Sequence, residues 1–138
     1  MCSIIGYSGN EIAAPIIVKG LKRMEYRGYD SVGVATESEN HIELKKGIGK
    51  VTEVNSKFQL DTLPGKIGIG HTRWATHGKV TDLNAHPHPS NSGKIAIVHN
   101  GIIENFEELK KQLEDDGYNF KSETDSEIIA NLLQKNYE

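Results

Sequence analysis

The alternation of isoleucine and glycine within residues 66–72 constrains the fold more than any other feature of the sequence. Ile67 and Ile69 are each followed by a glycine, and an apolar residue at every second position is typical of a β-strand. A glycine inside a strand marks a place where another element approaches closely. Residues 66–72 are therefore predicted to form a strand against which something packs at short range.

The rest of the chain places most strands early and two helices at the end. Further strands are predicted at residues 3–8, 32–36, 41–45 and 94–98, a helix at residues 12–24, and either helix or strand at residues 51–58. Asn105 with Glu108, and Thr124 with Glu127, have the spacing of capping boxes that begin two helices, and Gly117 is suited to end the first of them. This order predicts an α+β fold or a layered α/β fold.

The composition fits one domain and excludes several classes of protein. A length of 138 residues is usual for a single domain, and a net charge of −3 with mixed signs speaks against a nucleic-acid partner. No apolar run is long enough to span a membrane, and the N-terminus lacks the basic segment of a signal peptide. A single cysteine excludes an internal disulfide. We expect a cytoplasmic protein and, because the last helix has no stop signal, a fragment of a longer one.

Cys2 is the first candidate for chemistry. A lone free cysteine is most often a buried structural residue. Removal of Met1 would instead leave the thiol and a free α-amine on one residue, and an α-amine titrates near neutral pH. Such a cysteine could attack an electrophile with its own amine as the general base.

Polar residues cluster at residues 71–78, directly after the glycine-rich strand, where binding groups often lie. Arg73 offers a planar fork for a carboxylate, and Trp74, the only tryptophan, could cover a small ligand. A surface loop with one packed tryptophan explains these residues equally well.

Asn100 and Gly101 follow the strand predicted at residues 94–98. The Asn100 side-chain amide and the Gly101 backbone N–H could both donate to a developing oxyanion, but Asn-Gly is also a common turn that ends a strand. Asp125 likewise has two interpretations, as a helix cap or as an acceptor for a substrate ammonium group.

His86 and His88 have a His-x-His spacing that two metal ligands could share. No cysteine pair and no HExxH motif accompanies them. A loop braced by Pro87 and Pro89 is the simpler interpretation, and we expect no metal and no other cofactor.

Taken in order, these segments resemble the class II (N-terminal nucleophile) glutamine amidotransferase family and, within it, the isomerising glutamine–fructose-6-phosphate aminotransferases. The resemblance covers nearly the whole chain. The motifs that carry it are Met1-Cys2-x-Ile4-Ile5-Gly6, Glu25-Tyr26-Arg27-Gly28-Tyr29-Asp30-Ser31, His71-Thr72-Arg73-Trp74-Ala75-Thr76-His77-Gly78, Ala85-His86-Pro87-His88, Val98-His99-Asn100-Gly101-Ile102-Ile103-Glu104-Asn105 and Thr124-Asp125-Ser126-Glu127. The second and third motifs point to the aminosugar enzymes.

The resemblance implies a role for each catalytic candidate. Cys2 would attack the side-chain amide of L-glutamine, and its own amine would shuttle the proton. Asn100 and Gly101 would form the oxyanion hole. Arg73 would hold the α-carboxylate of glutamine and Asp125 its α-ammonium group.

The resemblance also implies the remaining pocket residues, the fold and the partners. Trp74, Thr76 and His77 would line the glutamine pocket, and His86 would lie in a loop tied to closure of the site or to contact with a partner domain. The implied fold is a four-layer α-β-β-α sandwich. The products would be glutamate and ammonia, and a separate sugar-phosphate isomerase domain of the same enzyme, a homodimer, would aminate fructose 6-phosphate.

Three departures and three alternatives accompany the resemblance. Ser3 stands where the family usually has glycine, and a retained Met1 would turn the Cys2 amine into an amide. Residues 1–138 are shorter than the family's glutaminase domain, so we expect a partial domain without its closing strands or isomerase domains, and with impaired activity.

The alternatives are a non-catalytic docking module, a metal-binding histidine protein, and the amidotransferase domain of another pathway, such as that of amidophosphoribosyltransferase.

Overall fold

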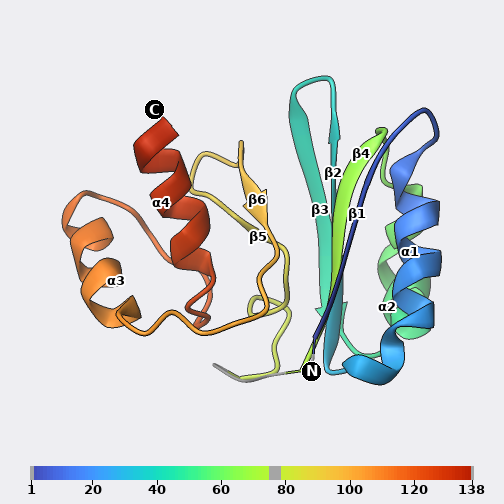
Figure 1. Cartoon of the computed structure of the whole chain (residues 1–138), viewed down its shortest axis with the longest axis horizontal. Helices are drawn as coiled ribbons and strands as arrows, with labels where there is room; N and C mark the ends of the chain where they lie inside the picture. The colour runs from blue at the N-terminus through green and yellow to red at the C-terminus, as the bar shows by residue number, and fades with distance from the viewer. Residues whose placement is uncertain (1, 75–78, 138) are drawn as a thin grey trace.

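The computed structural model describes residues 2–74 and 79–137, which form two β-sheets with helices on the outer side of each sheet (Figure 1). In chain order the elements are β1 (Ser3–Ser8), α1 (Ala13–Arg23), the 3-10 turn η1 (Glu25–Arg27), β2 (Ser31–Ser38), β3 (His41–Ile48), α2 (Val51–Phe58), the 3-10 turn η2 (Leu60–Thr62), β4 (Ile67–Arg73), β5 (His88–Pro89), β6 (Ala96–Ile97), α3 (Phe106–Asp115) and α4 (Glu127–Tyr137). Figure 1 shows α1 and α2 on one side of the first sheet, and the second sheet followed by α4 and α3 on its other side. This is the α-β-β-α order, so the predicted fold class is confirmed.

The first sheet is antiparallel throughout, with the strand order β1-β4-β2-β3. β4 is therefore an inner strand, with β1 on one side and β2 on the other. The β1–β4 register pairs Ser3 with Thr72, so the start of the chain lies beside the end of β4. The predicted strands at residues 3–8, 32–36, 41–45 and 66–72 are all confirmed.

The glycines of β4 allow α1 to pack tightly against the sheet, as the sequence predicted. A Cβ atom on Gly70 would lie 2.4 Å from Ile17 and 3.0 Å from Leu21, and one on Gly68 would lie 2.7 Å from Ile17. A Cβ at these distances would require the Ile17 side chain to shift, so the glycines allow the close approach. The buried core between α1, α2 and the sheet consists of Ala13, Ala14, Ile17, Val18, Leu21, Val32, Val34, Val51, Val54, Leu60 and Leu63.

The second sheet is a two-stranded hairpin that α4 holds in place. β5 pairs with β6, and the hairpin turn is bonded to α4 through buried Asn131, whose Oδ1 accepts the Asn91 N–H at 2.9 Å. Gln134 accepts the Ser92 N–H in the same way at 2.8 Å. Within residues 2–74 and 79–137, none of the helices has the length and apolar character needed to cross a membrane.

Several predictions about the second half of the chain were wrong in detail. The strand predicted at residues 94–98 shortens to β6, and β5 was not predicted because it has two residues, one of them proline. The Asn105 side chain makes no capping hydrogen bond to α3. Thr124 lies three residues before the first residue of α4. The Glu127 carboxylate accepts the N–H groups of Lys121 and Ser122, at 2.8 and 2.7 Å. The second capping box is thus replaced by a buried glutamate that satisfies the preceding turn.

Replacing Gly70 with alanine should destabilise the chain. The added methyl group would clash with Ile17 and Leu21, and overpacking of this kind costs about 1–3 kcal/mol. Chemical denaturation with circular dichroism detection would measure the loss. Gly6→Ala on β1 is the matched control, since its Cβ would meet only one carbonyl at 3.8 Å. Equal stability of the two variants would contradict the close approach of α1 to β4.

Candidate active site

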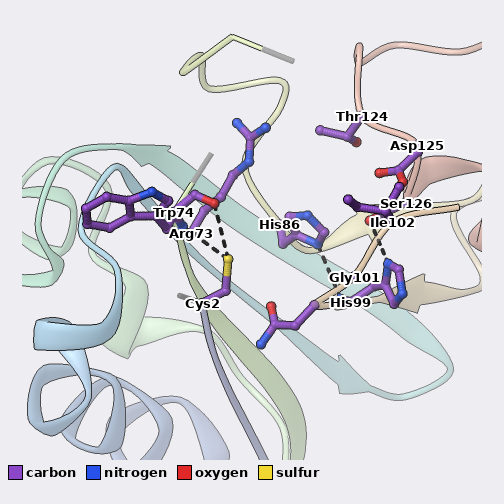
Figure 2. Close-up of a pocket in the computed structure, with 11 residues that line it drawn as sticks. Cys2, Arg73, Trp74, His86, His99, Gly101, Ile102, Thr124, Asp125 and Ser126 are labelled. Carbon is purple, nitrogen blue, oxygen red and sulfur yellow. Dashed lines mark hydrogen bonds between the residues drawn. The ribbon is translucent and has the colours of Figure 1, made fainter. Parts of the chain in front are cut away.

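A pocket of about 290 Å³ opens where the end of β4 faces the loops of the second half of the chain. Its lining includes seven of the nine residues predicted from the sequence: Cys2, Arg73, Trp74, His86, Asn100, Gly101 and Asp125. Figure 2 shows how Cys2 and Arg73 enter from one side and Asp125, Ser126 and His99 from the other. The remaining two predicted residues, Thr76 and His77, lie outside the described residues.

Cys2 reaches the pocket because β1 pairs with β4. The Trp74 N–H donates to the Cys2 Sγ at 3.1 Å, and the Sγ lies 3.4 Å from the Trp74 carbonyl oxygen (Figure 2). These two contacts join residues 72 positions apart and fix the direction of the thiol. Cys2 is half-buried, so it differs from the fully buried structural cysteine of the alternative interpretation.

Ser3, which departs from the family pattern, is accommodated without strain. Its side chain is buried, and its hydroxyl donates to the carbonyl of Met24 at 3.1 Å. The serine therefore ties the start of β1 to the end of α1, directly behind Cys2.

Arg73 brings a buried positive charge to the pocket. Its side chain is 3% exposed, and its Nη1 donates to the carbonyl of Lys79 at 2.9 Å. Burial lowers the pKa of the Arg73 guanidinium, while the nearby Cys2, Asp30 and Asp125 side chains act in the opposite direction. Two carboxylic acid side chains and the thiol thus lie in the field of one guanidinium.

Trp74 lies at the mouth of the pocket and is not packed in the core. It is 45% exposed, and its ring meets Tyr29 edge-on with 5.8 Å between centroids. An aromatic surface braced on one side in this way can cover a small ligand.

Asp125 lies opposite Arg73, just before α4. The carboxylate is 2% exposed, and its Oδ2 accepts the Ile103 N–H at 2.6 Å. The hydrogen bond holds the segment after Gly101 against the start of α4. Asp125 lies two residues before Glu127, the first residue of α4.

Asn100 is held by a histidine that the sequence reading did not assign to the site. The Nε2 of His71 lies 2.7 Å from the Oδ1 of Asn100, and His71 is completely buried. The adjacent His99 also bonds, through its Nδ1, to the Ser126 hydroxyl at 2.9 Å. These contacts tie the turn at residues 99–101 to β4 on one side and to the start of α4 on the other.

His71, His86 and His88 form a buried layer between the two sheets. The rings of His71 and His86 are stacked, with 4.1 Å between centroids and 19° between planes, and His88 meets His86 at 4.5 Å. The Nδ1 of His86 lies 3.4 Å from the His99 backbone N–H, and the Nε2 of His88 lies 2.7 Å from the Thr124 hydroxyl. His71, through Asn100 and His86, therefore connects the two halves of the chain, whereas His88 bonds within the second half.

Lys46 anchors the loop that carries His86. Its ammonium group donates to the carbonyls of Leu83, Ala85 and Pro87 at 3.2, 2.6 and 3.0 Å. Gly33 on β2 leaves room for this loop, since a Cβ there would lie 2.0 Å from the His86 carbonyl oxygen. Burial lowers the pKa of Lys46 to about 8, so the ammonium form still dominates at neutral pH.

The histidine layer is electrically neutral at physiological pH. Burial lowers the pKa of His71 to about 4 and that of His88 to about 2, and it lowers the pKa of His86 further below the ordinary value. The neighbouring Lys46 and Arg73 add to the lowering at His86 and His88. No group of three His, Cys, Asp or Glu side chains in the described parts of the chain is arranged to hold a metal ion.

Sequence reasoning missed the residues that support the pocket. The contacts of His71, His99, Ser126 and Lys46 join segments 27 to 41 positions apart. The available signal was that His71, His99 and Ser126 each share a motif with a predicted pocket residue, whereas Lys46 lies in none of the motifs.

The neutral histidines predict a stability that falls with acidity. In the folded chain they stay unprotonated below pH 6.5 because burial lowers their pKa, whereas in the unfolded chain they take up protons. The free energy of unfolding should therefore decrease as the pH falls below about 6.5, by up to about 1.4 kcal/mol per pH unit for each histidine. Urea titrations at several pH values would measure the slope. His88→Gln should reduce it and His41→Gln, at an exposed residue, should not; an unchanged slope in His88→Gln would contradict the neutral layer.

Comparison with known proteins shows which family the chain resembles. A family model described as glutamine amidotransferase domain matches residues 58–137. The chain is 59% identical over 136 residues to the isomerizing glutamine–fructose-6-phosphate aminotransferase of Pyrococcus horikoshii and 53% identical over 137 residues to that of Aquifex aeolicus. Each alignment covers 99% of this chain but 23% of the relative, so the chain spans less than a quarter of their length.

Solved structures share the fold at lower identity. The glutamine phosphoribosylpyrophosphate amidotransferase from B. subtilis superposes with a TM-score of 0.82 at 33% identity, covering 98% of this chain and 29% of that one. An allosteric regulatory enzyme of purine biosynthesis gives a TM-score of 0.83 at 34% identity. The predicted amidotransferase fold is therefore confirmed. Since the family model also matches more than half of its residues, the chain belongs to the glutamine amidotransferase domain family.

Proposed function

We propose that this chain is the glutaminase part of an isomerising glutamine–fructose-6-phosphate aminotransferase, and that it hydrolyses the side-chain amide of L-glutamine. The observation that carries the proposal is the shared pocket, which a thiol, an Asn-Gly pair, a guanidinium and a carboxylate all line. These groups match the parts of the reaction one for one: nucleophile, oxyanion donors, and partners for the two charged ends of an amino acid.

The Cys2 sulfur is the proposed nucleophile. After removal of Met1, the α-amine of Cys2 takes the thiol proton, and the sulfur attacks the amide carbon of glutamine. The C=O π-bond opens to an oxyanion. The α-amine then returns the proton to the leaving nitrogen, and ammonia departs as the carbonyl re-forms in a thioester. Water hydrolyses the thioester by the same proton transfers, which releases glutamate and the free thiol.

The side-chain amide of Asn100 and the backbone N–H of Gly101 are the proposed oxyanion donors. Both residues line the pocket that also contains the Cys2 sulfur. Donors fixed before the reaction stabilise the charge as it develops, and removing one such donor typically slows turnover by about 10²–10³-fold. The hydrogen bonds around residues 99–101 provide that rigidity.

Arg73 and Asp125 are the proposed partners of the α-carboxylate and α-ammonium groups of glutamine. Both are almost fully buried and reach the pocket from opposite halves of the chain. Their opposite charges suit the two oppositely charged ends of an amino acid, which each could bind by charge-assisted hydrogen bonds. Trp74 would cover the bound amino acid, as would Thr76 and His77.

The proposed acceptor of the ammonia is fructose 6-phosphate, bound by an isomerase domain that residues 1–138 do not contain. The support is the higher identity to the aminosugar enzymes, 59% against 33–34% for the purine-pathway structures. We propose that residues 1–138 are part of the glutaminase domain of a cytoplasmic, homodimeric enzyme of this kind.

Replacing Cys2 with alanine should abolish glutamine hydrolysis in the complete protein that carries this chain, because the mechanism has no other nucleophile. A coupled assay for glutamate release measures turnover, and mass spectrometry of the same sample reports whether Met1 has been removed. Ser8→Ala, at the far end of β1, is the control and should keep full activity. Turnover above background in Cys2→Ala would remove this residue from the nucleophile role. Lack of turnover in wild-type protein with Met1 removed would instead favour a docking module.

Replacing Asn100 with alanine should reduce kcat by about 10²–10³-fold and leave the KM for glutamine nearly unchanged, since the donor acts on charge that exists only in the transition state. Steady-state kinetics with the complete protein separate the two constants. Asn136→Ala, an exposed change on α4, should alter neither. An effect on KM alone would show that Asn100 binds the ground state instead.

A further inference from the structure

The Asn100 side chain can face the pocket in two ways, and only one of them is useful for the proposed chemistry. Its amide has a donor end, Nδ2, and an acceptor end, Oδ1. With Oδ1 engaged by a neighbour, Nδ2 is the end left to donate to an oxyanion. In the flipped orientation the oxygen would face the developing negative charge and repel it.

His71 contacts the acceptor end. Its Nε2 lies 2.7 Å from Oδ1, close enough for a strong hydrogen bond, and the ring is completely buried on β4. His71 is not among the residues that line the pocket, so it lies behind Asn100 with respect to the substrate site. The contact can therefore orient Asn100 without touching glutamine.

The hydrogen-bond partners of the two ring nitrogens of His71 favour a proton on Nε2. A neutral imidazole carries one N–H, and its Nδ1 is buried with no hydrogen-bond partner among the described residues. A proton on Nδ1 would leave a buried donor unsatisfied, which costs about 1–3 kcal/mol. An N–H at Nε2 can donate to the Asn100 Oδ1, and the buried Nδ1 then carries a lone pair and no unsatisfied donor.

His86 and the burial of the ring hold His71 in that state. His86 stacks on His71 at 4.1 Å and lies 3.4 Å, through its Nδ1, from the N–H of His99, the residue before Asn100. Burial lowers the pKa of His71 to about 4, so the ring is neutral near pH 7. Arg73 and His99 lower its pKa as well, while the hydrogen bond to Asn100 opposes them.

We propose that His71 is a positioning residue for the oxyanion hole: its Nε2–H donates to the Asn100 Oδ1 and so fixes Nδ2 as the end that faces the substrate. The inference rests on the proposed glutaminase activity and deepens it, since it assigns a cause to the orientation of Asn100. His71 acts only through Asn100 and makes no contact with the reacting atoms.

Two substitutions at His71 in the complete protein separate positioning from mere packing. His71→Leu removes the donor and should reduce kcat for glutamine hydrolysis by about 10–100-fold, with KM changed less than about threefold. His71→Gln places an amide nitrogen near the former Nε2 position and should restore most of that kcat. His88→Leu, the matched control from the same buried layer, should lower Tm but leave kcat within about threefold. Equal losses of kcat in His71→Gln and His71→Leu would overturn the proposal.

A double-mutant cycle tests whether His71 acts through Asn100. In an Asn100→Ala background there is no amide to orient, so His71→Leu should reduce kcat by less than about threefold further. If His71→Leu lowers kcat by the same factor in both backgrounds, the residue acts independently of Asn100 and the proposal fails.

The position of the proton on the His71 ring can be measured without a glutaminase assay. ¹⁵N NMR of the wild-type chain with labelled histidine distinguishes a protonated Nε2 from a protonated Nδ1, and His71→Gln identifies the signal. We expect the proton on Nε2. A proton on Nδ1 overturns the positioning role even in an active enzyme, whereas a proton on Nε2 in a protein without glutaminase activity would count against the proposed function alone.

Discussion

The antiparallel pairing of β1 with β4 is the constraint on which the site depends. It pairs Ser3 with Thr72, and this register brings the Cys2 sulfur to the N–H of Trp74. The pairing is itself held from behind by α1, whose Ile17 packs so closely on the glycines of β4 that a larger residue there would displace it. Because side chains alternate along a strand, the same arrangement turns His71 and Arg73 away from α1, toward the second half of the chain.

The second half of the chain is joined to the first by buried polar groups more than by a shared apolar core. Lys46 holds the loop at residues 83–87 through three carbonyls, and His71 and His86 hold the turn at residues 99–101. Buried polar groups of this kind are favourable only when they are satisfied, and they specify one arrangement rather than many. The result is a pocket with walls from both halves, in which hydrogen bonds hold the Cys2 thiol on one wall and the turn at residues 99–101 on the other (Figure 2).

The sequence was most informative where local physics decides the structure. The strand period and glycines of residues 66–72 predicted both β4 and its close neighbour, and the start of α3 was placed within one residue of Asn105. The sequence of residues 51–58 stayed ambiguous because eight residues with weak periodicity fit either a helix or a strand. The segment forms the helix α2, which packs Val51 and Val54 into the core. The capping box at Thr124 failed because tertiary partners, His88 for the threonine and the preceding turn for Glu127, outcompete the helix end.

The residues predicted around the pocket came from motifs, whereas the contacts that position them did not. Nothing in the sequence indicates that His71 meets Asn100 or that Lys46 meets the loop before His88, since each contact links segments with no shared pattern. Such contacts follow from the sheet register and from the alternation of faces along β3 and β4, which become visible only once the strand order is known. The roles of these residues in catalysis remain proposals.

The most direct test of the account is to trap the covalent intermediate on Cys2. The complete protein would be mixed with L-glutamine, quenched in acid during turnover, digested and analysed by mass spectrometry. The account predicts a γ-glutamyl group attached to the sulfur of a peptide that begins with Cys2. A γ-glutamyl group on any other residue, or turnover by protein that retains Met1, would contradict it.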